Sequence, residues 1–443
     1  MKLFFSNSIA YVCLVTSLLT TGSVSQAQNL KSLKTSHNSV YLERTKAERN
    51  FHDNLTAFDP GSSNSIRSVR YREVVNAIED FLALLDDEQR AAVVLPFDHP
   101  YRTRGFCYVL ARCAEDNVGL RMSQLNARQK IALNNVLMKS YSSAGYSRAI
   151  QTMNREGILQ EMEDAHRADP EKYRVVGSPL VPDWTPPPYR RSSDYYVAIF
   201  GQPAVATDNL TANPWGIRFE GHHLSSNFTF DGKAGRPKIN AMPMFFGSSP
   251  TIVPQSPTPE AGEYPQWQTQ EGQQLLHRET WLARSFLQSL DDKAIAKGAW
   301  SVLPDVALLG GTDVPLDAAS YLDGEKQGIP VTDLSPLQQS LLWDFAREFW
   351  QMQGNKDKID EYALKQSLNK SRVWWYGDRD DEHGELYFRV QSDRYLIELL
   401  QSNTFGVVSG DVEANHVHSS FRDLQNDWDR DSLGDHLRRH HVR

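Results

Sequence analysis

The chain has 443 residues, a formal net charge of −8 and 40% hydrophobic residues. Nucleic-acid binding needs a basic surface, so this acidic chain without a basic stripe argues against a nucleic-acid partner. The length is sufficient for one large or two modest domains with a real hydrophobic core.

The first 27 residues have the pattern of a cleaved secretory signal peptide. Lys2 gives a short positive region, an apolar run follows from Ile9 to Leu19, and Ser25-Gln26-Ala27 fits the small-x-small rule of signal peptidase. The apolar run is shorter than the roughly 20 helical residues that span a bilayer. We therefore expect a secreted or periplasmic protein whose mature chain has no transmembrane segment.

Residues 28–65 are polar and rich in Ser and Asn, which predicts a loose leader before a single domain over 66–443. Once the signal peptide is removed, only Cys107 and Cys113 remain. A local disulfide between them suits an oxidising compartment. Six residues apart they face away from each other on a helix, so a bridge requires a loop or bend there.

The first half of the domain reads as mainly helical. Val74, Ile78 and Phe81 recur at helical spacing, and a short second helix follows. A longer segment, 122–142, has a broad apolar face. The expected helices cover 71–85, 86–97, 122–142 and 145–167.

After a proline-rich linker at 176–193 the pattern changes to strands, then to helices, then to strands again. The expected later helices cover 272–290 and 335–352. The expected strands cover 194–201, 215–230, 371–378, 385–391, 394–401 and 414–421. This order predicts an α+β fold, with helices packed on a mainly antiparallel sheet.

Five pairs of segments resemble each other in the same order, which indicates an internal duplication. The alternative is chance similarity between short helical and strand segments. A duplication would give halves 66–240 and 270–443, each a helical block followed by a β block, around a pseudo-two-fold axis. The pairs are 81–94 with 286–299, 125–141 with 334–350, 194–201 with 385–392, 216–221 with 394–400, and 222–228 with 416–422.

The stretch "RFEGHHLSSNF", residues 218–228, contains two adjacent histidines and a carboxylate. If it continues as one strand, Arg218, Glu220 and His222 share a face and His223 points to the other face. One histidine then lines a polar pocket while the other makes a hydrogen bond in the core.

A second histidine pair, His416 and His418, has the H-x-H spacing that lets two imidazoles on one strand face converge on an ion. The duplication would bring this pair to His222 and His223. We therefore predict that all four histidines are metal ligands, for zinc, copper or iron. Acid–base chemistry by histidine without a metal is the alternative, and a lone strand histidine is more often structural.

The duplication also sets Glu220 against Glu398. These two carboxylates and Asp423 are the candidate catalytic residues, as acid–base groups or as partners that orient the metal ligands. Other chemistries lack their motifs. The sequence has no H-E-x-x-H, G-x-S-x-G or G-x-x-x-x-G-K-[ST] and no paired C-x-x-C.

Four motifs stand out together: "WGIRFEGHHLSSNF", "MFFGSSP", "YFRVQS…YLIELL" and "NHVHSSFRD…ND". Together they resemble those of a secreted family, domain-of-unknown-function family 3500. The resemblance runs from about Arg70 to His436 and departs from the family pattern at Asp429, where a Gly is usual, and at Ser392-Asp393, where Gly-Pro is expected. It implies no assigned reaction, but it implies that both histidine motifs occur in one domain.

These patterns predict a secreted metal-dependent enzyme, a hydrolase or an oxidase, with a His/Glu site shared by the two halves. Its substrate, a small molecule or a polymer, is not specified by the sequence. One alternative is an extracytoplasmic protein that binds a metal or small ligand without turnover. A third interpretation is an envelope protein whose histidines complete a hydrogen-bond network.

Overall fold

A computed structural model describes most of the chain after residue 63. Residues Ser62–Arg443 form one compact unit, and all that follows concerns that unit. The expected signal peptide, Cys107, Cys113 and His436 lie outside the described residues. The described residues are 64–104, 118–176, 183, 185–186, 191–204, 213–232, 238–256, 263–303, 328–353, 361–381, 384–403, 406–408 and 415–429.

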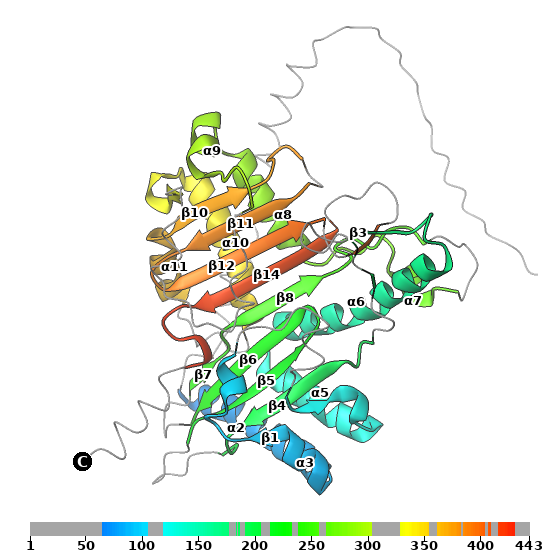
Figure 1. Ribbon diagram of the computed structural model, residues 1–443. Helices are drawn as coiled ribbons and strands as arrows, with labels where there is room; N and C mark the ends of the chain where they lie inside the picture. The colour runs from blue at the N-terminus through cyan, green and yellow to red at the C-terminus, as the bar shows by residue number, and fades with distance from the viewer. Residues whose placement is uncertain are drawn as a thin grey trace, which may run out of the picture. The chain divides into compact units, whose positions relative to one another are not determined.

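A 12-stranded sheet dominates the unit (Figure 1), and its strands run in the order β1-β4-β5-β6-β8-β14-β12-β11-β10-β9. β2 pairs with β4, and β7 pairs with β6. All named pairings are antiparallel except that of β1 with β4. The strands are β1 (Val94–Leu95), β2 (Leu120–Arg121), β4 (Tyr195–Phe200), β5 (Trp215–Gly221), β6 (Leu224–Asp231), β7 (Lys238–Asn240), β8 (Met244–Ser248), β9 (Ile329–Pro330), β10 (Arg372–Tyr376), β11 (Leu386–Gln391), β12 (Tyr395–Ser402) and β14 (His416–Asp423).

The helices of each half lie beside that half's strands (Figure 1), and the α+β prediction is confirmed. A separate two-stranded ribbon pairs β3 (Arg174–Val176) with β13 (Gly406–Val408). No helix in the described ranges is both long and apolar enough for a membrane span. The helices are α2 (Asn64–Ala83), α3 (Asp87–Val93), α5 (Ala127–Ser140), α6 (Ser143–Ala168), α7 (Pro265–Gln270), α8 (His277–Gln288), α9 (Asp292–Gly298), α10 (Pro336–Met352) and α11 (Glu361–Asn369).

Helix starts are set by side-chain caps, in the same places in both halves. Asp86 caps α3 and Asp291 caps α9, each by accepting a hydrogen bond from a backbone N–H of the first turn. Asn126 and Ser335 close reciprocal capping boxes at α5 and α10. Such caps satisfy amide groups that have no partner within the helix, so they fix where each helix begins.

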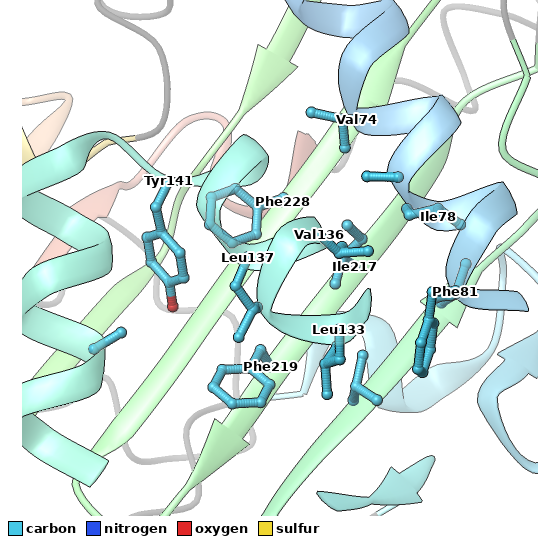
Figure 2. Packing of buried hydrophobic residues seen from close by; sticks show 14 of the residues in the cluster. Val74, Ile78, Phe81, Leu133, Val136, Leu137, Tyr141, Ile217, Phe219 and Phe228 are labelled. Atoms are coloured by element: carbon cyan, nitrogen blue, oxygen red, sulfur yellow. The ribbon is translucent and has the colours of Figure 1, made fainter. Parts of the chain in front are cut away.

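One face of the sheet is apolar and packs against the helices. Figure 2 shows Val74 and Ile78 of α2 and Val136 of α5 gathered over Ile217 and Phe228 of the sheet. All of these side chains are almost completely buried. Their spacing repeats every three or four residues in the helices and every two in the strands, so the sequence pattern itself builds this layer.

The sheet has a pseudo-two-fold arrangement about the seam between β8 and β14. At that seam Met244 pairs with Phe421. The outer strands of the two halves have the same neighbours. In the first half β4 pairs with β2 in the antiparallel sense and with β1 in the parallel sense. In the second half β10 pairs with β9 in the antiparallel sense and forms a parallel bridge with Ala299. The ladders therefore equate β4 with β10, β5 with β11, β6 with β12, and β8 with β14.

This arrangement corrects part of the predicted duplication. The two helical matches agree with the structure, since 81–94 and 286–299 each contain the short helix, α3 or α9, that follows the Asp cap. The strand matches were wrong by one strand, because they equated β4 with β11. Short strands with alternating apolar residues resemble any neighbouring strand, so similarity alone did not fix the register. The first half also extends beyond residue 240 to include β8.

The corrected register changes which residues are equivalent. Arg218 lies opposite Asn227, and Arg389 lies opposite Glu398, so Asn227 takes the place of Glu398. The Nε of Arg218 donates to Glu220 at 2.7 Å, and the Nε of Arg389 donates to Gln391 at 3.0 Å. Glu220 thus corresponds to Gln391, and the expected pairing of Glu220 with Glu398 is not present.

Candidate metal centre

The adjacent histidines lie in a tight hairpin turn and not within a strand. β5 ends at Gly221 and β6 begins at Leu224, and these two residues pair. His223 has a φ of 62°, in the left-handed region that few non-glycine residues adopt. The predicted alternation was wrong here, because the turn lets both His222 and His223 face the same carboxylate.

His416 and His418 come from the beginning of β14, and both rings meet His223. The Nε2 atoms of His223 and His416 are 2.8 Å apart. The ring centre of His418 lies 5.2 Å from that of His223 and 4.5 Å from that of His416. One ligand atom from each of the three residues lies within 4.8 Å of the others. The three imidazoles can therefore share one ion.

A second group of donors shares His223. Glu156 of α6 lies with its Oε1 2.7 Å from the Nδ1 of His222 and 3.4 Å from the Nδ1 of His223. The rings of His222 and His223 have centres 3.7 Å apart. One ligand atom from each of these three residues also lies within 4.8 Å of the other two.

Glu156 was missed by sequence analysis, although a signal was present. It lies three residues after Met153 and three before Leu159, both of which are buried. Helical periodicity therefore puts a carboxylate on the buried face of α6, which is rare unless the carboxylate has a partner. Its partner His222 is 66 positions away, so the sequence gives no sign of which group it meets.

The environment favours neutral histidines. Burial, followed by the neighbouring His222, holds the pKa of His223 well below 6.5, while Glu156 opposes the shift. Burial and then His416 lower the pKa of His418 in the same direction. A neutral imidazole is the form that binds a metal, so both rings are prepared as ligands at neutral pH.

Close packing holds these rings in position. The backbone N–H of Gly247 donates to the carbonyl of His223 at 2.7 Å. A Cβ at Gly247 would lie 2.7 Å from Cδ2 of His418 and 2.9 Å from Cδ2 of His223. The absence of a side chain at this position therefore allows the two rings to approach across β8.

The distance between His223 and His416 suits a tetrahedral ion after a small adjustment. Two nitrogens each about 2.05 Å from a tetrahedral ion lie about 3.3 Å apart. The 2.8 Å between His223 and His416 requires only a modest ring rotation to reach that value. An all-imidazole donor set suits zinc, copper, iron or nickel, and is a poor match for calcium or magnesium.

The three predicted catalytic carboxylates lie elsewhere, in polar networks of the sheet. Glu220 accepts from Arg218, Tyr101 and Ser225. Glu398 accepts from the hydroxyls of Tyr387 at 2.6 Å and Ser420 at 3.1 Å. Neither belongs to a candidate metal group of the described chain. Each carboxylate is engaged in holding strands together.

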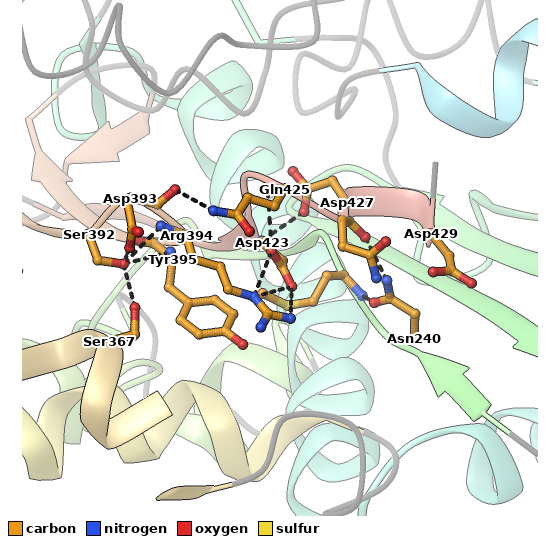
Figure 3. A network of polar contacts seen from close by, with 12 residues as sticks. Asn240, Ser367, Ser392, Asp393, Arg394, Tyr395, Asp423, Gln425, Asp427 and Asp429 are labelled. Carbon is orange, nitrogen blue, oxygen red and sulfur yellow. Dashed lines mark hydrogen bonds and ion pairs between the residues drawn. The ribbon is translucent and has the colours of Figure 1, made fainter. Parts of the chain in front are cut away.

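Asp423 belongs to the pseudo-symmetric counterpart of the histidine hairpin, drawn in Figure 3. There the turn residues are Asp393 and Arg394, in the places of His222 and His223. Arg394 pairs with Asp423 at 2.9 Å, and the backbone N–H of Asp423 donates to Asp427. The second half thus fills this position with an ion-pair network, and only the first half presents histidines here.

One family of known sequences matches most of this chain. The sequence matches the family described as "Protein of unknown function (DUF3500)" over residues 67–430. The chain belongs to the DUF3500 family. No curated protein and no solved structure shows significant similarity to it.

The two departures from the DUF3500 pattern have structural explanations. Asp429 has a φ of 47°, a left-handed conformation that glycine adopts without cost, which accounts for the glycine expected there. At the other position, the hydroxyl of Ser392 accepts hydrogen bonds from the backbone N–H groups of Arg394 and Tyr395. That side chain holds the turn where Gly-Pro was expected.

Proposed function

We propose that this protein is a metal-dependent enzyme, a hydrolase or an oxidase, whose ion is held by His223, His416 and His418. The convergence of these three imidazoles carries the proposal, with one ligand atom of each within 4.8 Å of the others. Three protein ligands leave a coordination position for water or substrate, which is typical of catalytic rather than structural sites.

The surrounding residues support a reactive centre. A bound ion of this class lowers the pKa of a water ligand to about 7, or exchanges electrons if it is copper or iron. His223 is completely buried, whereas His418 retains some exposure, so access to the ion would come from the His418 side. Glu156 accepts a hydrogen bond from His222 and so orients the hairpin.

A purely structural network explains the cluster less well. In such a network each buried ring nitrogen should have a hydrogen-bond partner. The Nδ1 of His223 is buried and has no well-aligned hydrogen-bond partner, although the Oε1 of Glu156 lies 3.4 Å away. A non-catalytic metal- or ligand-binding protein remains the second candidate, because it would use the same three ligands.

Metal analysis followed by a substrate screen separates these functions. The purified full chain is loaded with zinc, copper or iron, desalted and assayed for bound metal. We expect stoichiometric metal, and less of it in His416→Ala and His418→Ala but not in His277→Ala, an exposed histidine of α8. No bound metal after loading would refute the proposal. Turnover of an ester, peptide or oxidisable substrate only by the loaded protein distinguishes an enzyme from a binder.

Export is proposed from the N-terminal pattern alone. Lys2, the apolar run and Ser25-Gln26-Ala27 predict cleavage after residue 27. Expression in a secreting host should give a protein whose first residue by mass spectrometry is Gln28. An intact N-terminus on protein retained inside the cell would contradict this proposal and leave the metal site untouched.

A further inference from the structure

His223 presents a different ring nitrogen to each of the two donor groups. Its Nε2 faces His416 at 2.8 Å, and its Nδ1 faces the Oε1 of Glu156 at 3.4 Å. A neutral imidazole that loses its one N–H proton becomes an imidazolate, which has a lone pair on each nitrogen and can bind an ion at each side. The geometry of His223 is therefore that of a bridging ligand.

The second group has the composition of a metal site in its own right. Glu156 provides a carboxylate oxygen, and His222 provides Nδ1 at 2.7 Å from that oxygen. His222 is 9% exposed, Glu156 2% and His223 0%. A buried carboxylate is costly unless it is paired with a cation or is well hydrogen-bonded. Two imidazoles and one carboxylate match the ligand sets of zinc and copper sites.

We propose that the protein holds two transition-metal ions bridged by the imidazolate of His223. One ion is bound by His223 Nε2, His416 and His418, and the other by His223 Nδ1, His222 and Glu156. This inference rests on the proposed metal centre and extends it from one ion to two. The residual imidazole N–H proton is released to solvent when the second metal–nitrogen bond forms.

Charge and packing are consistent with such a bridge. The Glu156 carboxylate and the His223 imidazolate together offset two of the four positive charges of two divalent ions. His223 is held between the two groups by its left-handed backbone and by the hydrogen bond from Gly247 to its carbonyl. A residue in this sparsely populated conformation persists only where its surroundings fix it, and such residues cluster at functional sites.

Copper(II) is the probe that reveals a bridge directly. The full chain is stripped with a chelator, titrated with Cu(II) at neutral pH, and examined by equilibrium dialysis and electron paramagnetic resonance. We expect two Cu(II) per chain, with the mononuclear signal growing up to one equivalent and decreasing towards two. The decrease follows because an imidazolate bridge couples the two unpaired electrons antiferromagnetically.

Variants test which residues hold the second ion. Glu156→Gln and His222→Ala should bind one Cu(II) and give a full uncoupled signal. Asp164→Asn, at an exposed carboxylate two turns along α6, should behave as the native protein. Thermal unfolding of each variant checks that it is folded, and the native titration gives the decisive result even if a variant fails to fold.

Each outcome has a separate meaning. Two coupled ions support the bridge. One ion per chain overturns this inference and leaves the proposed single metal centre intact. No bound ion overturns both. Two ions with undiminished, additive signals also overturn the bridge, because the second ion would then lie away from His223.

Discussion

The Nε2 atoms of His223 and His416 lie 2.8 Å apart, although the two residues are 193 positions apart in the chain. His223 belongs to the hairpin of the first half, and His416 begins the last strand of the second. Their meeting depends on the seam where β8 pairs with β14. The candidate metal centre therefore exists only when both halves have assembled into one sheet.

Metal binding should consequently stabilise the whole domain. A ligand that binds only the folded state adds about 2.7 kcal/mol when its free concentration is 100 times the Kd. We expect Zn(II) or Cu(II) to raise the thermal unfolding temperature of the chelated protein by several degrees. The shift should become smaller in His416→Ala, which lacks one ligand of the three-histidine site, and persist unchanged in His277→Ala. An equal shift in both variants would show that the metal stabilises the protein through another site.

Gly247→Ala should damage the site through packing alone. The new Cβ would lie 2.7 Å from the ring of His418 and 2.9 Å from that of His223, closer than real Cβ contacts allow. Displacing ligands by a few tenths of an ångström should weaken metal binding at least tenfold, by about 1.4 kcal/mol or more. Isothermal titration with Zn(II) measures the change.

The matched control for that substitution is Gly216→Ala in β5. Its Cβ would lie 3.0 Å from the backbone oxygen of Phe228 and touch no histidine. It should lower stability while leaving metal affinity unchanged. Similar metal affinities in Gly247→Ala and the native protein would show that the ring positions around Gly247 are not those of the metal ligands.

The sequence predicted most of the longer helices and strands, but it did not predict which residues distant in the chain pair with each other. Periodicity located the longer helices and most strands, whereas α9, α11 and β8 were not predicted. The equivalent caps Asp86 and Asp291 became visible only in the structure. The hairpin at His222 was missed because its turn has none of the usual Asn-Gly or Asp-Gly signals. Glu156 was missed because its partners come from a distant strand turn. The strand register of the duplication failed for the same reason, since pairing is decided across the sheet and not along the chain.

The stability of the metal-free protein should fall as the pH drops below 6.5. Burial lowers the pKa of His223 and of His418 in the folded state, so the unfolded chain binds protons that the folded chain does not. Their contribution to stability is present above the unfolded pKa of about 6.5 and is lost progressively below it, at up to about 1.4 kcal/mol per pH unit for each histidine.

Urea unfolding in chelator between pH 7.5 and pH 5.5 measures this slope. The double variant His223→Asn, His418→Asn should flatten it, whereas His277→Asn should not. If the native protein and the double variant share the same slope, the pH dependence comes from other groups.

Replacing Arg155 should stabilise the fold, whereas most substitutions of buried residues destabilise it. It is 3% exposed, and its Nε and Nη1 are buried without a hydrogen-bond partner. Burial lowers its pKa to about 10, so it is charged at neutral pH. A buried charge without a counter-charge costs several kcal/mol, and methionine fills a similar volume. Arg155→Met should therefore raise the free energy of unfolding by about 1–3 kcal/mol.

Arg218→Met is the matched comparison, because Arg218 is equally buried but paired. It bonds Glu220 at 2.7 Å and the carbonyls of Tyr101 and Arg104. Its removal leaves a buried carboxylate without its cation and should cost about 3–5 kcal/mol. Urea unfolding of both variants at one pH shows whether each substitution raises or lowers the free energy of unfolding. If Arg155→Met lost as much stability as Arg218→Met, the Arg155 guanidinium would have to be paired with a counter-charge in solution. Removing a buried charge that has no counter-charge cannot destabilise the fold by that amount.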